Sequence, residues 1–189
     1  MKKKIIFIMN PISGTASKAG IPNLIDSTLD KELFEYEIKL TERAGHASEL
    51  ATEAKNNHAD IVVAVGGDGT VNEVARSLVH SDTALGILPC GSGNGLARHL
   101  LLPMNLRKSI EVINACKIND LDYGVINGHP FFCTCGMGFD AFVSMKFAES
   151  GKRGPISYAE NILREGLKYE PETYTLEDET GTKQYKAFL

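Results

Sequence analysis

Residues 60–79 read DIVVAVGGDGTVNEVARSLV, and this stretch decides the kind of fold that the chain can adopt. Residues 60–65 form an almost continuous apolar run, which is typical of a strand buried on both faces of a sheet. Gly66, Gly67 and Gly69 allow a tight turn, and a helical pattern begins near Thr70. The stretch therefore predicts a strand, a glycine-rich turn and a helix whose positive N-terminal end faces that turn.

The same alternation of strand and helix extends over the first 115 residues. Further strands are predicted at residues 4–9, 35–40 and 85–88. Helices are predicted up to residue 31 and over residues 46–57, 70–79, 93–102 and 106–115. Strands that alternate with helices favour a parallel sheet with helices on both faces. We therefore expect residues 1–116 to form a three-layer, doubly wound α/β domain.

The pattern changes near residue 117, where we expect a β-rich unit to begin. Strand-like runs at 121–126 and 130–135 meet at Asn127-Gly128, a strong hairpin signal because both turn positions favour positive φ. A helix is predicted over 156–167, and a second hairpin across Thr180-Gly181. The chain ends at Leu189 inside an apparent strand, so we expect a fragment whose β-rich unit, residues 117–189, is incomplete.

Composition narrows the class of protein. The 189 residues carry a net charge of -4 with acids and bases interspersed, which gives no footprint for nucleic acid. No apolar stretch is long enough to span a membrane, and the N-terminal apolar run is too short for a signal peptide. The four cysteines lack zinc-site spacing, so we expect reduced thiols in the cytoplasm. An unpaired edge strand would also favour self-association into a homo-oligomer.

Asp68, inside the glycine-rich turn, is the residue that suggests chemistry. A carboxylate beside a phosphate repels it unless a metal ion or a hydroxyl proton lies between them. Asp68 therefore points to phosphoryl transfer, whereas the structural alternative is a turn in which the aspartate only caps the helix.

Two other turns follow predicted strands, NPISG at 10–14 and PCGSGNGLAR at 89–98, and Thr41 follows a third strand. In a doubly wound sheet the carboxyl ends of the strands meet at one edge, where ligands bind. The chain has neither the G-x-x-x-x-G-K-[ST] of a P-loop nor a G-x-G-x-x-G after its first strand.

Taken together, NPISG, TERAGHA, GGDGTVNEV and PCGSGNGLAR resemble the catalytic domain of diacylglycerol, sphingosine and ceramide kinases and their bacterial relatives. The run LDYGVINGHPFFCTCGMGFDA looks like the start of that family's β-sandwich domain. The resemblance implies a nucleotide-binding domain like that of NAD kinases and diacylglycerol kinases, followed by a truncated, lipid-binding β-sandwich. Residues 99–103 lack a glycine often seen there, a departure that we expect to be harmless.

The resemblance also implies an ATP-dependent lipid kinase that uses Mg²⁺ and moves the γ-phosphate to a lipid hydroxyl. Asp68 would orient the magnesium ion or accept the hydroxyl proton, and Asp140 would lie near the lipid head group. The metal ligands stay unknown, because part of the family's catalytic and metal set would lie beyond Leu189. The residues expected to bind ATP are Asn10, Ser13, Gly14, Thr41, Gly66, Gly67, Asp68, Gly69, Thr70, Asn72, Gly91 and Ser92.

Two alternatives stay open at this point. An NAD kinase-like enzyme would share the GGDG turn, and a nucleotide-binding regulator would keep ATP binding without turnover. The lipid itself is also open among diacylglycerol, phosphatidylglycerol and sphingoid bases. We expect the protein to lie in the cytoplasm and to meet its lipid by peripheral association with a membrane surface.

Overall fold

The computed structural model describes residues 2–12, 18–149, 162 and 169–188, which divide between two compact units, Met1–Cys133 and Thr134–Leu189. Residues 117–133 group with the first unit because Phe132 packs against its core and the Tyr123 hydroxyl lies 2.9 Å from Nε2 of His80. The domain boundary after residue 116 stays a prediction.

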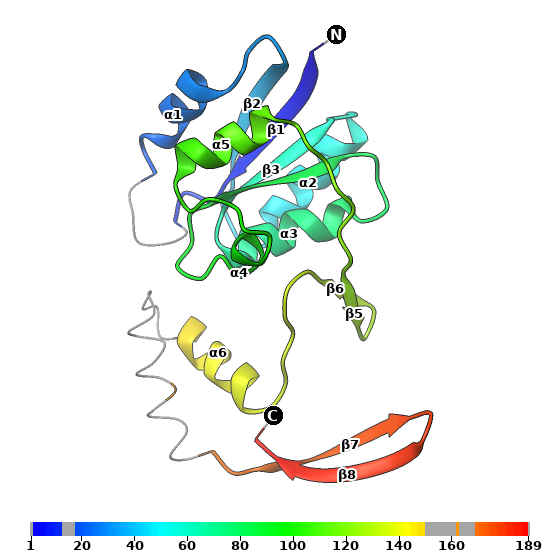
Figure 1. Cartoon of the computed structure of the whole chain (residues 1–189). Helices are drawn as coiled ribbons and strands as arrows, with labels where there is room; N and C mark the ends of the chain where they lie inside the picture. Colours follow the sequence, from blue (N-terminus) through cyan, green and yellow to red (C-terminus); the bar gives the residue numbers. More distant parts are fainter. Residues whose placement is uncertain (1, 13–17, 150–161, 163–168, 189) are drawn as a thin grey trace. The chain divides into compact units, whose positions relative to one another are not determined.

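The first unit is built on a parallel sheet with the strand order β2-β1-β3-β4 (Figure 1). Its strands are β1 (Lys3–Met9), β2 (Phe34–Leu40), β3 (Ile61–Gly66) and β4 (Ala84–Pro89). In the register, Ile5 of β1 pairs with Tyr36 on one side and Ile61 on the other. All residues of β3 are buried, which explains why its sequence is apolar without alternation.

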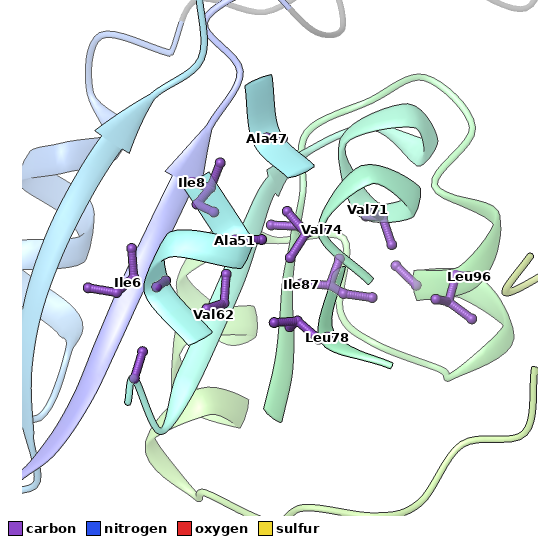
Figure 2. Packing of buried hydrophobic residues seen from close by; sticks show 14 residues of the cluster. Ile6, Ile8, Ala47, Ala51, Val62, Val71, Val74, Leu78, Ile87 and Leu96 are labelled. Atoms are coloured by element: carbon purple, nitrogen blue, oxygen red, sulfur yellow. The ribbon is translucent and has the colours of Figure 1, made fainter. Parts of the chain in front are cut away.

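Helices cover both faces of this sheet, which confirms the doubly wound α/β fold (Figure 1). Helices α1 (Ile21–Thr28) and α5 (Leu106–Asn114) pack on one face, against the side chains of Ile5 and Phe7. Helices α2 (His46–Asn56), α3 (Asp68–Leu78) and the short α4 (Gly95–His99) pack on the other. Figure 2 shows Ile6 and Ile8 of β1 pointing into this second layer, as alternation along a strand requires.

Two predicted helices are too long. The first ends at Thr28 instead of residue 31, where Leu29 turns to an extended conformation. The helix predicted over 93–102 is α4, which covers only Gly95–His99. It ends because Leu101 takes a left-handed conformation with φ of 56°, before Pro103 is reached.

The hairpin predicted at Asn127-Gly128 is confirmed. Strands β5 (Gly124–Ile126) and β6 (His129–Phe131) pair antiparallel, and Asn127 and Gly128 have φ of 50° and 79°. Strand β6 is shorter than the predicted run 130–135. It ends at Phe131, and the cysteines at 133 and 135 lie beyond it and are exposed.

The second unit contains helix α6 (Phe139–Glu149) and strands β7 (Glu172–Asp178) and β8 (Gly181–Ala187). The hairpin is confirmed, but its turn lies one residue earlier than predicted because Asp178 pairs directly with Gly181. Helix α6 was not predicted, and the helix predicted over 156–167 lies outside the described residues except for residue 162. The assignment of this unit to a β-sandwich stays a prediction. Within the described part of the chain, no helix is long and apolar enough to cross a membrane.

Candidate functional site

The loops singled out in the sequence gather at the carboxyl edge of the sheet, meaning the ends of β1 to β4 and the loops that follow them. Backbone bonds continue the sheet pattern past the strand ends. Thr41 N–H donates to Met9 O at 2.9 Å, Asn10 N–H to Val65 O at 3.1 Å and Cys90 N–H to Gly66 O at 2.8 Å. The strand order reverses between β1 and β3, and open α/β sheets bind ligands at the carboxyl edge of such a point.

The loops after β3 and β4 pack backbone against backbone at Gly67 and Gly91. A Cβ atom added to Gly91 would lie 2.4 Å from the Gly67 Cα, and one added to Gly67 would lie 3.1 Å from the Gly91 Cα. Neither position has room for a side chain without movement of the opposite loop. Gly67 and Gly91 therefore allow the two loops to pack closely against each other, in addition to permitting turns.

Asp68 joins the same two loops through its side chain. Its Oδ2 accepts the Asn94 N–H at 2.9 Å and its Oδ1 accepts the Gly95 N–H at 2.5 Å. The carboxylate thus caps the N-terminus of α4 from another element, while its own residue begins α3. Asp68 is nevertheless exposed, so a ligand at the carboxyl edge can reach it.

The N-terminal turn of α3 offers backbone donors at this edge. Its N-cap, Gly67, has no side chain to cap the helix, and the N–H groups of Asp68, Gly69 and Thr70 have no partner within it. Gly69 is exposed, and a Cβ atom added there would meet no atom within 4 Å. An 11-residue helix with an open first turn is suited to binding a phosphate group.

The loop after β4 is held by Asn94, a residue that the sequence analysis did not select. Its side chain accepts the Gly91 N–H and donates to the Gly91 carbonyl, both at 2.8 Å. Ser92 is exposed between these two residues. The available signal was an asparagine in a glycine-rich turn, since asparagine tolerates the left-handed conformation and bonds to nearby backbone.

The loop after β2 is tied to α3 by Glu73, which lies in the GGDGTVNEV motif. Its carboxylate accepts the Gly45 N–H at 3.0 Å and the Ala47 N–H at 3.2 Å. This contact caps α2 and fixes the TERAGHA loop, at whose start Thr41 is buried. Asn72, one position before Glu73, is half-buried.

Lys18 is a third residue that was not predicted from the sequence. It is only 7% exposed, and its Nζ donates to the Asn10 carbonyl at 2.8 Å. Burial lowers the pKa of the Lys18 amine, an effect that the neighbouring Cys90 thiol partly offsets. Burial likewise raises the pKa of Cys90. A buried cation thus lies at the carboxyl edge, and the signal for it was a lysine in the Ser- and Gly-rich turn after the first strand.

The described part of the first unit contains all the predicted site residues except three. Ser13 and Gly14 lie outside the described residues. Asp140 belongs to the second unit, in the first turn of α6, where its carboxylate lies against Gly136. Its role toward a lipid stays a prediction.

Comparison with known proteins gives one consistent result. Residues 4–126 match the family described as "Diacylglycerol kinase catalytic domain". A diacylglycerol kinase of Staphylococcus saprophyticus is 32% identical over 163 residues, which cover 84% of this chain and 53% of that protein. A diacylglycerol kinase of Staphylococcus aureus is 30% identical over 163 residues, or 84% of this chain and 51% of that protein.

A solved structure agrees with these sequence matches. A crystal structure of a diacylglycerol kinase from Bacillus anthracis matches 68% of this chain and 48% of that chain, with a TM-score of 0.59 and 26% identity. The chain therefore spans about half the length of these relatives.

Proposed function

The chain belongs to the diacylglycerol kinase catalytic domain family, and from this premise we propose that it is the nucleotide-binding part of an ATP-dependent lipid kinase. The reaction is transfer of the γ-phosphate of ATP to a lipid hydroxyl. The observation that carries the proposal is the open first turn of α3, interlocked through Asp68 with the loop after β4. In phosphoryl transfer, catalysis consists mainly of positioning and charge stabilisation, which is what a rigid pair of loops supplies.

In this proposal the phosphates of ATP bind at the first turn of α3. The N–H groups of Gly69 and Thr70 and the helix dipole attract the anion. Ser92, exposed on the loop after β4, would add a hydroxyl, and the buried amine of Lys18, bonded to the Asn10 carbonyl at the end of β1, would contribute a further donor. Thr41, Asn10 and Asn72 would complete the nucleotide contacts.

Asp68 is the proposed catalytic residue. Each carboxylate oxygen has about two lone-pair positions. One position on each oxygen accepts a backbone N–H, which leaves one on each for a magnesium ion or a lipid hydroxyl. When bound, Mg²⁺ would neutralise charge on the phosphates.

The described residues contain no group of three or more His, Cys, Asp or Glu side chains that could hold a metal ion. Magnesium in kinases is commonly held by one or two carboxylates together with the substrate phosphates, so Asp68 fits that mode.

The acceptor is proposed to be a lipid that the protein meets at the cytoplasmic surface of a membrane. Diacylglycerol, phosphatidylglycerol and sphingoid bases are the candidates. Transfer of labelled phosphate from ATP to each lipid, measured with the full-length protein that contains this chain, would identify the acceptor. Nucleotide binding without transfer to any lipid would favour a nucleotide-binding regulator instead.

The position of the phosphates can be tested at Gly69 without disturbing the fold. Gly69→Glu and Gly69→Gln place side chains of equal size in open space, and replacing a helical glycine should not lower stability. The added carboxylate would repel the phosphates by about 4 kcal/mol at 4 Å separation with an effective dielectric constant of 20. We expect calorimetry to show a loss of ATP affinity of about a hundredfold or more for Gly69→Glu and a much smaller loss for Gly69→Gln. Equal affinities of the two variants would exclude phosphates from this turn.

A further inference from the structure

We propose that Asn94 is a positioning residue for phosphoryl transfer, because it fixes the loop whose backbone orients the Asp68 carboxylate. This inference rests on the proposed function. Asn94 itself need not touch either substrate. Its effect would reach the reaction through Asp68 and through the exposed Ser92.

Asn94 holds the backbone of Gly91 through two hydrogen bonds from its side chain, a pair of bonds that forms a clamp. The Asn94 side chain is 7% exposed and forms two hydrogen bonds of 2.8 Å to the backbone of one residue, as acceptor and as donor. The backbone of Asn94 is left-handed, with φ of 55° and ψ of 46°. A buried side chain with both polar groups bonded holds this conformation, which most residues avoid.

The clamp also affects the Asp68 carboxylate. The N–H groups of Asn94 and Gly95 are the two donors to the Asp68 carboxylate, so the direction of those donors is set by the conformation at residue 94. The space around the carboxylate is also restricted by the loop. A Cβ atom on Gly93 would lie 2.7 Å from Asp68 Oδ2, and one on Gly95 would lie 3.5 Å from Oδ1. The loop therefore determines both where the carboxylate points and how far it can move.

The position of Ser92 depends on the same clamp. It lies in the segment that the clamp closes, between Gly91 and Asn94, and it is exposed. Because Gly91 is packed against Gly67, the closed segment cannot shift without displacing the loop after β3. Loss of the clamp would thus free Ser92 and loosen Asp68 together. The donors in the first turn of α3 belong to a different helix and would remain.

The variant Asn94→Gly tests whether the Asn94 side chain positions Asp68. Glycine keeps the left-handed backbone and the N–H that Asp68 accepts, and it removes the clamp together with a long contact of the Asn94 amide with the Met104 sulfur. Asn94→Asp is a second variant in case the first folds poorly. Aspartate tolerates the same backbone but cannot donate to the Gly91 carbonyl. The matched control is His58→Gly, because His58 also has φ of 55° but follows the C-terminal end of α2, away from these loops.

We expect Asn94→Gly to lower kcat by about tenfold to a hundredfold, since small misplacements of catalytic groups have effects of this order. The dissociation constant for Mg-ATP should change by less than about fivefold, because the donors of α3 remain. Deuterium exchange at the Gly95 amide should become at least about tenfold faster, which corresponds to about 1.4 kcal/mol of lost protection. Asn94→Asp should show the same changes in kcat and in exchange at Gly95, and its added negative charge makes its ATP affinity no part of the test. His58→Gly should show none of the changes.

The inference is overturned if folded Asn94→Gly and Asn94→Asp keep the kcat of the natural protein. It is also overturned if Asn94→Gly only melts at a lower temperature and retains slow exchange at Gly95, because that result describes a purely structural role. If the natural full-length protein transfers no phosphate to any lipid, the proposed function fails and this inference falls with it. If the natural protein is active and the variants match it, only the inference about Asn94 fails.

Discussion

At the scale of single residues, the position of Asp68 combines exposure with two backbone hydrogen bonds. A carboxylate that accepts N–H groups on both oxygens has a fixed orientation, yet each oxygen keeps a position for another partner. The capping role considered from the sequence is therefore present, but in a different form. Asp68 caps α4 and not the helix that it begins. This cap is compatible with the catalytic role proposed for Asp68, because it provides the orientation that such a role would need.

From the proposed catalytic role we expect Asp68→Asn to reduce kcat for lipid phosphorylation by about a hundredfold or more, the scale of losing a positioned acid or base. Asparagine has nearly the same shape, but its amide group would face an N–H donor and lose one of the two bonds. Asp60→Asn is the control, since the Asp60 carboxylate also accepts a backbone N–H, from Lys4 at 2.7 Å, but at the amino end of the sheet. Steady-state kinetics of both variants would show whether Asp68 acts in turnover. A normal kcat with only a raised KM for ATP in Asp68→Asn would mean that Asp68 serves in binding alone.

The site residues that were predicted from the sequence lie in a recognisable local pattern, and most of those that were missed act through contacts between distant segments. Glycines and Asp68 were recognisable because their local pattern, a strand followed by a turn and a helix, restricts what they can do. Glu73 acts through contacts with a loop that is distant in sequence, and the backbone of Asn94 bonds to a carboxylate that is equally distant. Lys18 was missed because its burial depends on the packing of several strand ends. Such contacts follow from the assembled fold, which local periodicity does not describe.

At the scale of elements, the helices of the first unit end in an unusual way. Residues other than glycine take the left-handed conformation after four of the described helices, namely His58, His80, Leu101 and Cys116. After α4 the pattern is a Schellman motif, in which the Leu102 N–H donates to Ala97 O and the Leu101 N–H to Arg98 O. Glycine is the residue favoured at the position of Leu101. The absence of glycine in residues 99–103 therefore has a conformational cost and is not entirely harmless.

We expect Leu101→Gly to raise the free energy of unfolding by about 0.5–1 kcal/mol. The left-handed conformation costs a residue with a Cβ about 1–2 kcal/mol, and the flexibility of glycine in the unfolded chain offsets about half of that. The Leu101 side chain is 89% exposed, so little packing is lost. Urea denaturation would measure the change. Leu102→Gly is the matched control, because Leu102 packs against the core and its loss should be destabilising. A less stable Leu101→Gly would show that Leu101 makes contacts that outweigh its backbone cost.

Element prediction failed where the hydrophobic pattern carries no period. Helix α6 has the sequence FDAFVSMKFAE, whose apolar residues are spread around the whole helix. Without an apolar stripe, such a segment cannot be recognised as a surface helix from sequence. Helix α4 was predicted too long for the opposite reason, because residues 100–102 continue an apolar pattern after the backbone has already turned at Leu101.

At the scale of the whole molecule, the doubly wound sheet was the most predictable feature. Continuous apolar strands alternating with helices allow few arrangements other than a parallel sheet covered on both faces. The convergence of the loops follows from that topology, since parallel strands end at one edge. The hydrophobic pattern could not predict how the loops after β3 and β4 are held together. Their contact depends on backbone packing at Gly67 and Gly91 and on hydrogen bonds to the Asp68 carboxylate. The placement of ATP at this edge is supported by that geometry and stays a proposal.

The first unit supplies the residues of its own hydrophobic core. All buried members of its two core clusters lie between Ile5 and Ile113, and the proposed phosphate-binding loops lie within the same range. We therefore expect a fragment of residues 1–133 to unfold cooperatively and to bind Mg-ATP with a dissociation constant within about threefold of that of the longer chain, a difference of about 0.7 kcal/mol. It should transfer no phosphate to lipid.

A fragment of residues 1–116 serves for comparison, because it lacks Phe132, which packs against the core, and Tyr123, which bonds to His80. Loss of these contacts should reduce stability by about 1–3 kcal/mol, the scale of one aromatic side chain partly removed from a core. Denaturation curves of the two fragments then distinguish a domain boundary at residue 116 from one at residue 133. Equal stability would place the domain boundary at residue 116, as the sequence predicts, and a 1–133 fragment that fails to fold would show that the first unit depends on the rest of the chain.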